Sequence, residues 1–239
     1  MASSKQPVAV VTGASSGIGK EISIQLAKHN FNLILIARSK NKLLNIKKEI
    51  QHIGATCQII VLDVSSKTMI QGLKSKIKNL ENVQILINNA GIGIFDKIED
   101  VTFEDWEKQI NTNLRGSFLL SQFFIPNFKR NKCGKIVFMN SVAGLNPYPF
   151  AVPYVASKYA LRGLSASLRE ELREYNIKVI SVHPGAVDTP LWEKSGSDFP
   201  RNEMMSSDDV AKITIEAIFA PNNVVCEEII LRRTAGDFK

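Results

Sequence analysis

The sequence is poor in cysteine and contains no long apolar run. Its three cysteines, Cys57, Cys133 and Cys226, are far apart and form no CxxC pair. A disulfide framework or a zinc site is therefore not expected, and this cysteine usage fits a reducing compartment. No segment approaches the roughly 20 apolar residues of a membrane helix, and the polar start 1–7 leads into a strand-like run without a signal-like segment. We therefore expect a soluble, cytoplasmic protein with no membrane partner and no metal site.

The chain also lacks internal repeats, low-complexity tracts and Pro/Gly-rich linkers. Its 239 residues are enough for one well-buried α/β domain but few for two, which favours a single domain over 1–239. The formal net charge of +7 is compatible with nucleic acid, a membrane surface or an anionic ligand. The lysines are spread along helix-like stretches, without a dense block or a recognised nucleic-acid motif. We interpret them as solvated helix faces and expect no nucleic-acid partner.

Short β-rich apolar runs alternate with longer amphipathic segments. Runs such as Leu33-Ile34-Leu35-Ile36 are apolar throughout, which is typical of strands buried on both faces. The alternation predicts an α/β fold: a doubly wound, Rossmann-like parallel sheet of about seven strands with helices on both faces. The predicted strands are 8–12, 32–37, 58–62, 83–88, 135–140, 178–182 and 228–231. The predicted helices are 17–30, 40–53, 66–79, 103–130, 154–175 and 207–219, the last with a capped start. The longest aperiodic stretch, 185–207, predicts a binding loop, with 186–206 as its substrate-binding part.

The first predicted strand ends in a glycine-rich turn, Thr12-Gly13-Ala14-Ser15-Ser16-Gly17-Ile18-Gly19, and a helix pattern follows. Glycines let backbone N–H groups approach a phosphate, and the helix N-terminus then faces the negative charge. Ligands of open parallel sheets bind at the carboxyl ends of the strands, where this turn lies. Because the spacing is Gly-x-x-x-Gly-x-Gly and not the standard dinucleotide fingerprint, the turn by itself fits either a phosphate site or a purely structural role.

Further motifs follow in order along the chain. Asn88-Asn89-Ala90-Gly91 follows the fourth strand, Asn113 lies in a long helix, Ser141 ends the fifth strand, Tyr154-x-x-x-Lys158 starts a helix, and Pro184-Gly185 follows the sixth strand. With the glycine turn, these motifs make residues 8–190 resemble the short-chain dehydrogenase/reductase family. The resemblance implies an extended Rossmann domain, oxidoreductase activity with a nicotinamide cofactor, and assembly into homodimers or homotetramers.

The residue after the second strand indicates which cofactor is used. A carboxylate there typically binds the ribose hydroxyls of NAD, whereas an arginine accommodates the 2′-phosphate of NADP. The sequence has Ala37-Arg38-Ser39, a permanent cation with a planar donor fork and no acid. We therefore predict NADP(H), the alternative being that Arg38 is only a surface residue. The resemblance adds Asp63 as an adenine contact, although Asp63 could instead cap a helix, and it gives Asn88 a mainly structural role. The expected cofactor contacts are Gly13, Ser15, Ser16, Gly17, Ile18, Gly19, Arg38, Asp63, Val64, Asn89, Ala90, Gly91, Tyr154, Lys158, Pro184, Gly185, Val187 and Thr189.

The candidate catalytic residues centre on Tyr154 and Lys158, whose spacing of four puts them on one helix face. Carbonyl reduction needs a hydride on carbon and a proton on oxygen. A free tyrosine, with a pKa of about 10, is a poor base, but a nearby ammonium and an oxidised nicotinamide would lower that pKa. The phenol could then act as general acid in reduction and general base in oxidation. Ser141 could donate a hydrogen bond to the substrate oxygen. The resemblance implies that Lys158 also binds the nicotinamide ribose, and that Asn113, chosen over Asn111, disturbs its helix and supports a water relay.

The predicted substrate pocket is mostly apolar or aromatic, with Phe95, Val142, Pro147, Tyr148, Phe150, Leu191 and Trp192 as candidates. It favours a carbonyl compound with an apolar portion. A 3-oxoacyl thioester is one candidate, and small 3-hydroxy acids, pterins and xenobiotic ketones are the alternatives left open. The alternative function is a catalytically silent NADP(H)-binding regulatory protein, since a fold alone does not confer activity, but the complete set of catalytic residues argues against it.

The resemblance also implies that helices 103–130 and 154–175 form the interface of the oligomer. The first of them carries more apolar surface than one helix face usually needs: Phe118, Leu119, Phe123, Phe124 and Phe128. Ordinary core packing is the alternative explanation for these residues.

Overall fold

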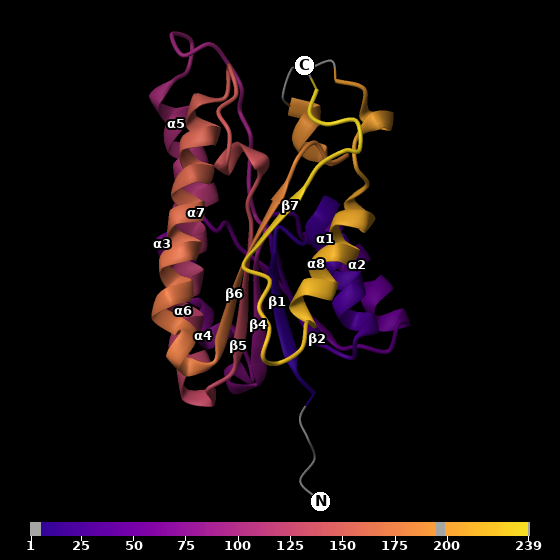
Figure 1. The fold of residues 1–239 in the computed structure, drawn as a ribbon. Helices are drawn as coiled ribbons and strands as arrows, with labels where there is room; N and C mark the ends of the chain where they lie inside the picture. The colour runs from indigo at the N-terminus through magenta and orange to yellow at the C-terminus, as the bar shows by residue number, and fades with distance from the viewer. Residues whose placement is uncertain (1–5, 195–198, 239) are drawn as a thin grey trace, which may run out of the picture.

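In the computed structural model, which describes residues 6–194 and 199–238, seven parallel strands form one sheet in the order β3-β2-β1-β4-β5-β6-β7 (Figure 1). The strands are β1 (Val8–Thr12), β2 (Asn32–Ala37), β3 (Cys57–Val61), β4 (Val83–Asn88), β5 (Gly134–Met139), β6 (Ile177–Pro184) and β7 (Glu228–Leu231). The strand order reverses between β1 and β4, which creates a crevice at the carboxyl edge of the sheet. The predicted fold class is confirmed.

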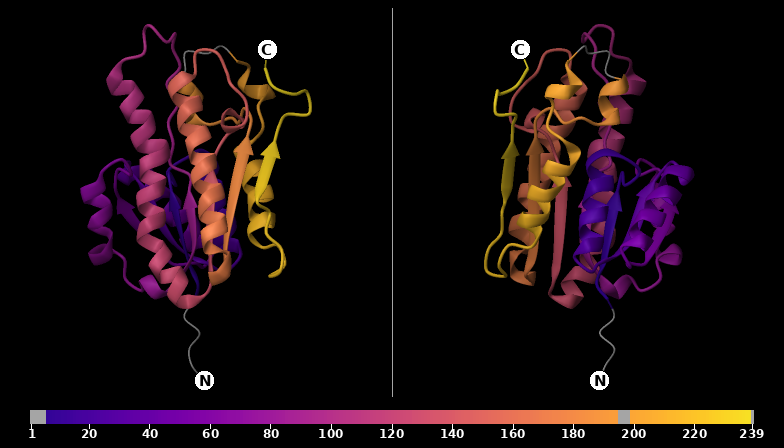
Figure 2. Two further views of the ribbon diagram at one scale, coloured as in Figure 1. Left: turned by 60° about the vertical axis from the view of Figure 1, so that its left-hand side comes forward. Right: turned by 90° about the vertical axis from the view of Figure 1, so that its right-hand side faces the viewer.

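Helices cover both faces of the sheet, as the views in Figure 2 show. One face carries α1 (Gly17–Lys28), α2 (Lys40–His52) and α8 (Ser207–Ile218), and the other carries α3 (Lys67–Gln71), α4 (Leu73–Lys76), α5 (Phe103–Gln109), α6 (Gly116–Asn131) and α7 (Val152–Leu172). Strands β1 to β6 therefore contribute side chains to two cores, one on each face of the sheet. In β2, Leu33 and Leu35 join the core under α1 and α8, whereas Ile34 and Ile36 join the core on the opposite face. This division explains why the strand sequences are apolar throughout.

Several predicted boundaries need correction. Strands β3 and β5 begin and end one residue earlier than predicted, and β6 extends to Pro184 because His183 and Pro184 still pair with β7. The predicted helix 66–79 is two short helices separated at Gly72. The predicted helix 103–130 consists of α5 and α6 joined by a π-helical segment, η2 (Ile110–Arg115). The remaining short helices are η1 (Leu80–Asn82), η3 (Val142–Gly144), η4 (Arg173–Tyr175), η5 (Pro190–Lys194) and η6 (Arg201–Glu203).

The predicted binding loop 186–206 is partly ordered into η5 and η6, and an isolated bridge pairs Val187 with Met205. Residues 195–198 of this loop lie outside the described residues. The predicted capped start of the last helix is present. The Ser206 hydroxyl, one residue before α8, accepts from the Asp209 N–H at 3.0 Å.

The apolar residues proposed for an interface on α6 are mostly core residues. Phe124 and Phe128 are fully buried, and Leu119 and Phe123 pack partly against the same core. Only Phe118, 44% exposed, faces outward. The excess of apolar residues on this helix is therefore explained largely by core packing, the alternative considered above.

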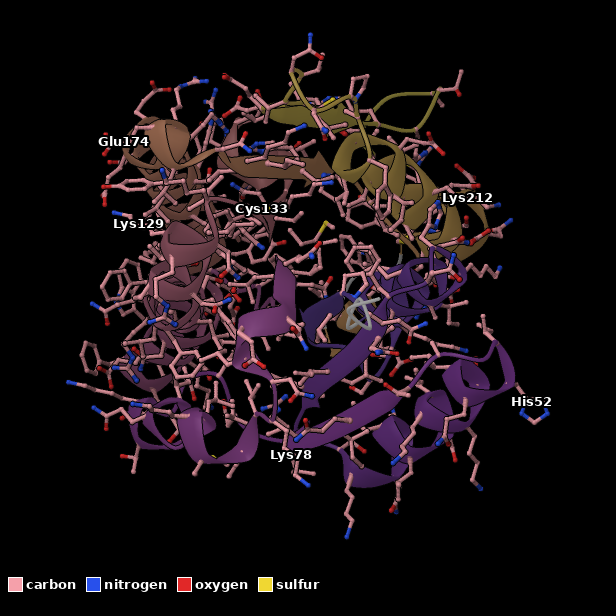
Figure 3. All side chains as sticks on the ribbon, turned by 90° about the horizontal axis from the view of Figure 1, so that it is seen from below. His52, Lys78, Lys129, Cys133, Glu174 and Lys212 are labelled. Atoms are coloured by element: carbon pink, nitrogen blue, oxygen red, sulfur yellow. The ribbon has the colours of Figure 1, made fainter. Side chains whose placement is uncertain are left out.

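The amino ends of the strands form the opposite end of the molecule. Figure 3 views this end, where Lys78, Lys129 and Lys212 lie toward the periphery. Lys212 is 58% exposed at its side chain and pairs with Asp208 on the same helix, as expected for a solvated helix face. Within residues 6–194 and 199–238, no helix combines the length and the apolar character needed to cross a bilayer.

Candidate active site

The glycine turn after β1 interlocks with the end of β4. Gly13 and Gly17 have left-handed φ angles of 62° and 53°, which favour glycine. At Gly19 an added Cβ would lie 2.4 Å from the Asn89 amide nitrogen and 2.6 Å from the Gly13 carbonyl oxygen, so no larger residue fits. The Asn89 side-chain amide donates to the carbonyls of Thr12 and Gly13, at 2.9 and 3.3 Å. This side chain therefore holds the two strand ends together.

Thr12 adds a second set of bonds at the same junction. Its hydroxyl donates to the Ile87 carbonyl at 3.1 Å and accepts the backbone N–H groups of Asn89 and Ala90, both at 3.0 Å. Asn88 is buried, and its amide donates to the Ser121 hydroxyl at 3.1 Å. These bonds fix the backbone of residues 88–90 next to the glycine turn.

The start of α1 and the end of β2 present donors toward the crevice. Ser16 is the N-cap residue of α1, but its side chain makes no capping bond. The Ala14 N–H donates to the Ile36 carbonyl at 3.4 Å, so the glycine turn lies beside the end of β2. Arg38, at this end, is exposed and forms no ion pair or hydrogen bond with a described residue. A free guanidinium beside a helix N-terminus forms a suitable site for a phosphate.

Asp63 is not the helix cap that was considered as its alternative role. Its carboxylate accepts from the Ser65 N–H at 2.9 Å and from the Ser65 hydroxyl at 2.7 Å, which closes a tight turn after β3. The helix cap is Ser66, whose hydroxyl accepts from the Met69 N–H at 3.3 Å. Val64 is buried beside this turn.

Asn113 lies within the π-helical segment and is 1% exposed. Its amide oxygen accepts from the Ile92 N–H at 2.8 Å, and its amide nitrogen donates to the Ile92 carbonyl at 2.9 Å and to the Ser157 hydroxyl at 3.0 Å. The predicted disturbance of the helix is therefore present at this residue. Four residues earlier, the Gln109 amide oxygen accepts from the Ile94 N–H at 3.0 Å. Together these two amides fasten the loop after β4 to the helix.

Tyr154, Lys158 and Ser141 meet at the carboxyl edge of the sheet. Tyr154 lies in the first turn of α7, and Lys158 follows one turn later, 5% exposed. The Lys158 Nζ donates to the Met139 carbonyl at 2.9 Å and lies 5.6 Å from the centroid of the Tyr154 ring. The side chain of Ser141 lies close enough to the Tyr154 hydroxyl to influence the pKa of the phenol.

Burial shifts the pKa values of both ionisable groups. It raises the pKa of Tyr154 above its ordinary value of 10, while the hydrogen bond from Ser141 lowers that pKa. Burial lowers the pKa of Lys158 to about 8. The protein alone therefore keeps the phenol protonated at neutral pH, and it holds an ammonium beside the phenol that is close to losing its proton.

The segment after β6 closes the crevice from the other side. The Gly185 N–H donates to the Leu231 carbonyl at 2.8 Å, and Val187 is buried. A Cβ added at Gly17 would lie 3.1 Å from the Thr189 methyl carbon, so this segment reaches the glycine turn. The two predicted cofactor motifs, far apart in the sequence, thus lie in contact.

An aromatic row runs outward from Tyr154, and we refer to Phe95, Trp192, Phe199 and Phe238 as the aromatic wall. Phe95 packs edge-on against Tyr154 with centroids 5.4 Å apart, and stacks on Trp192 at 6.1 Å. Trp192 meets Phe199 at 5.9 Å, and Phe199 stacks on Phe238 at 5.0 Å. The Trp192 Nε1–H donates to the Val187 carbonyl at 3.0 Å, which anchors the wall to the segment after β6.

Sequence similarity agrees with this geometry. The family model described as short chain dehydrogenase matches residues 7–199. The chain belongs to the short-chain dehydrogenase family.

Curated relatives of this short-chain dehydrogenase include sepiapterin reductase from Chlorobaculum tepidum, which is 34% identical over 97% of the chain and 98% of the relative. The 3-ketodihydrosphingosine reductase of Bos taurus is 35% identical over 96% of the chain and 69% of the relative. Among solved structures, the alcohol dehydrogenase from the archaeon Thermococcus sibiricus complexed with 5-hydroxy-NADP has a TM-score of 0.89 at 29% identity, over 98% of this chain and 100% of that one. The short-chain dehydrogenase from Sphingobium yanoikuyae in complex with NADPH has a TM-score of 0.86 at 27% identity, over 94% and 87% of the two chains.

The pocket of this short-chain dehydrogenase differs in part from the predicted one. Phe95 and Trp192 join the aromatic wall as expected, and Val142 is buried. Phe150 is 57% exposed, and Pro147 is also exposed, so neither packs into the wall. The Tyr148 hydroxyl donates to the Asp237 carboxylate at 2.7 Å.

Sequence reasoning missed several residues of this short-chain dehydrogenase that build the site. Asn89 was expected only as a cofactor contact, without the bonds of its side chain to Thr12 and Gly13, and Gln109 was not singled out. The position of Gln109 four residues before Asn113, on the same helix face, was a usable signal. Phe199 lies within the predicted binding loop 186–206 but was not singled out, and Asp237 and Phe238 belong to no motif with a characteristic spacing.

Proposed function

We propose that this chain is an NADP(H)-dependent oxidoreductase that reduces a carbonyl, or oxidises the matching secondary alcohol, with Tyr154 as general acid or base. The observation that carries the proposal is the meeting of Tyr154, Ser141 and a buried Lys158 at the carboxyl edge of the sheet, beside a glycine turn. Relatives named as reductases and solved structures with NADP or NADPH support the same reading.

The residues around the crevice fit a dinucleotide with an added phosphate. At Gly19 an added Cβ would collide with Asn89 and Gly13, so the segments after β4 and β1 approach the start of α1 closely. The N–H groups of the first turn of α1 would hold the pyrophosphate, and Arg38 would bind the 2′-phosphate. The other contacts are the predicted ones: Gly13, Ser15, Ser16, Gly17, Ile18, Asp63, Val64, Asn89, Ala90, Gly91, Pro184, Gly185, Val187 and Thr189. When bound, the nicotinamide supplies or accepts the hydride.

Tyr154 transfers the proton. In reduction the substrate oxygen takes the proton of the phenol, and the raised pKa of Tyr154 keeps that proton in place until charge develops on the oxygen. The Ser141 hydroxyl lies beside the Tyr154 hydroxyl and can donate its hydrogen to the substrate oxygen, which holds the carbonyl against Tyr154. The two hydroxyl groups thus form a donor pair for one oxygen atom.

Lys158 and Asn113 support the proton transfer. The Lys158 ammonium stabilises a tyrosinate through its charge, and its pKa of about 8 permits proton exchange near neutral pH. Asn113 has its amide bonded to Ile92 and Ser157, which fixes the loop and the helix face on either side of Lys158. In this proposal Lys158 returns a proton to the tyrosinate after turnover, and a water held by Asn113 then replaces the proton that Lys158 has lost.

The substrate carries an apolar or planar portion next to its carbonyl. The aromatic wall starts at Tyr154, so the group attached to the reacting carbon faces aromatic rings. Aromatic walls favour planar or apolar partners. A pterin side-chain ketone, an aryl diketone, a long-chain 3-ketone and a 3-oxoacyl thioester are the classes to test.

Self-association is part of the proposal. Phe118 on α6 and Tyr159 on α7 are 44% and 42% exposed on the helices that the family resemblance implicates in the interface. We expect a homodimer or homotetramer. Light scattering on the wild type and on Phe118→Lys decides between these states and a monomer.

The test is NADPH and NADH binding, followed by NADPH oxidation with sepiapterin, 1-phenyl-1,2-propanedione, 3-ketodihydrosphingosine in micelles and an acetoacetyl thioester. Tyr154→Phe is the matched variant, because it removes only the hydroxyl. Preferential NADPH binding with turnover that Tyr154→Phe abolishes supports the proposal. Binding without turnover of any probe favours the silent regulatory protein, and failure to bind either nucleotide refutes the proposal.

A further inference from the structure

His183 is a fully buried histidine directly behind the catalytic edge of the sheet. It lies one residue before the end of β6 and pairs with Ile230 of β7. Its side chain is 0% exposed, whereas His29 and His52 are exposed. Neither the cofactor contacts nor the proton-transfer steps proposed above use it. A buried polar ring at this place needs an explanation from its contacts.

The contacts of the ring define its protonation state. The His183 Nδ1 lies 3.2 Å from the Ser141 carbonyl oxygen. A carbonyl oxygen can only accept, so Nδ1 carries the hydrogen. The Nε2 atom is buried without a hydrogen-bond partner among the described residues. Its nearest charged neighbour is a Glu228 carboxylate oxygen at 3.9 Å.

Burial of the His183 ring favours its neutral form. Glu228, at the start of β7, is held by two bonds from Arg162 on α7, at 2.9 and 3.0 Å, so its charge is already paired. Burial lowers the pKa of His183, with Arg162 and Lys158 acting in the same direction, while Glu228 and the bond to Ser141 oppose the shift. At neutral pH His183 is therefore an uncharged ring with its hydrogen on Nδ1.

The bond from His183 adds to a set of hydrogen bonds around Ser141. The Ser141 N–H donates to the Asn140 amide oxygen at 3.0 Å, and the Ser141 hydroxyl accepts from the Ala143 N–H at 3.1 Å. The Ser141 carbonyl accepts from the Gly144 N–H at 2.9 Å, and His183 is its second partner, from the side of β6. A catalytic group must be held within about 0.5 Å of its productive place.

We propose that His183 is a positioning residue for carbonyl reduction: its Nδ1–H bond to the Ser141 carbonyl holds the Ser141 hydroxyl at the Tyr154 hydroxyl. This inference rests on the proposed function, in which Ser141 and Tyr154 share the substrate oxygen. His183 itself touches neither substrate nor cofactor.

Two substitutions separate this role from a merely structural one. His183→Asn places an amide N–H near the position of Nδ1, whereas His183→Gln moves the amide out to the position of Nε2. With 1-phenyl-1,2-propanedione as the probe, kcat of His183→Gln should fall about 10- to 100-fold, the range expected when a reacting group is displaced. KM and the Kd for NADPH should stay within about twofold, because binding contacts are unchanged. His183→Asn should recover most of kcat.

Ser181→Ala is the control for loss of a buried polar atom. Ser181 is 0% exposed, two residues earlier on β6, and its hydroxyl has no partner among the described residues. We expect this variant to keep the wild-type kcat. Equal losses in His183→Asn and His183→Gln, or a wild-type kcat in His183→Gln, would overturn the proposal.

The tautomer can be read without any substrate. The protein has three histidines, so ¹⁵N-histidine NMR at pH 7 with His183→Asn for assignment isolates the His183 signals. We expect a neutral ring protonated at Nδ1, and a ring protonated at Nε2 or at both nitrogens refutes the inference. The same assays separate this inference from the proposed function. If Tyr154→Phe still turns over the substrate, the proposed function is refuted. If Tyr154→Phe is inactive while His183→Gln is fully active, only the role of His183 is refuted.

Discussion

Replacing Arg38 by glutamine should weaken the binding of NADPH and leave the binding of NADH almost unchanged. Arg38 is exposed at the end of β2 and pairs with no described residue, so its donors are free to bind an anion. The glycine turn lies beside it, because the Ala14 N–H bonds the Ile36 carbonyl at 3.4 Å. NADPH differs from NADH by one phosphate. The comparison of the two nucleotides therefore isolates the contribution of this charge.

The magnitude follows from the type of bond and from the exposure of Arg38. A hydrogen bond to a charged group contributes about 1.5–3 kcal/mol, and screening at an exposed site favours the lower part of that range. About 1.4 kcal/mol corresponds to a tenfold change in affinity. We therefore expect the Kd for NADPH to rise about 10- to 30-fold and the Kd for NADH to change less than about twofold. The loss should shrink as salt is added.

Titration of nucleotide fluorescence at low and high salt measures both constants. Lys48→Gln is the control, since it removes the same charge from an exposed position farther along α2. An equal loss of affinity for NADPH and NADH would refute the reasoning, because it would mean that Arg38 does not distinguish the phosphate. An equal effect of Lys48→Gln would refute it as well, by showing that only net charge matters.

Three further predictions concern other parts of the molecule. Gly19→Ala should abolish NADPH binding because its Cβ would lie 2.4 Å from a side-chain amide, whereas Gly163→Ala, where nothing lies within 4 Å of the added atom, should bind normally in the same titration. Lys178→Met should lower the free energy of unfolding by about 2 kcal/mol and Tm by about 4–8 °C. The reason is that Lys178 Nζ donates to the carbonyls of residues 221 and 224 after α8, at 2.8 and 2.6 Å. Calorimetry measures the change, and Lys212→Met, on the exposed face of α8, should change Tm little. Lys158→Met should be inactive yet no less stable at pH 7. The folded-state pKa of Lys158 is about 8 against an ordinary 10.5, so the unfolded chain binds more protons between these values and wild-type stability should rise with pH there. Urea unfolding should show wild type gaining up to about 2 kcal/mol relative to the variant between pH 7 and 9.5, and no gain would contradict the assignment.

The sequence predicted the sheet well because its strands carry a simple signal. β1, β2, β4 and β7 have the predicted bounds, and each of the first three contains a run of at least three consecutive apolar residues. β6 was predicted too short at its carboxyl end because histidine and proline interrupt the apolar pattern, although both residues pair with β7. The break at Gly72 was missed because a single glycine is tolerated in many helices, and only tertiary packing decides whether the helix continues.

The parts of the site that could be predicted belong to motifs with fixed spacing. Tyr154 and Lys158 share a helix face whatever surrounds them, because four residues make about one turn. The contact between Tyr154 and Ser141, by contrast, depends on where a strand end and a helix start meet. The outer half of the aromatic wall comes from Phe199 and Phe238, and their positions are set by folding of the whole chain.

The π-helical segment η2 accommodates one extra residue within a long helix. Residues 103–131 run continuously through α5, η2 and α6, but the wide turn takes one residue more than an α-helix would. Each residue of a regular α-helix turns the chain by about 100°, so an extra residue in such a helix would turn one end away from its contacts by that angle. The wide turn absorbs the extra residue, and α5 and α6 keep the faces that a regular helix one residue shorter would give them. Gln109 therefore bonds Ile94 while Phe124 and Phe128 lie in the core. The pattern of inward-facing residues consequently shifts by one position in the sequence where it crosses η2.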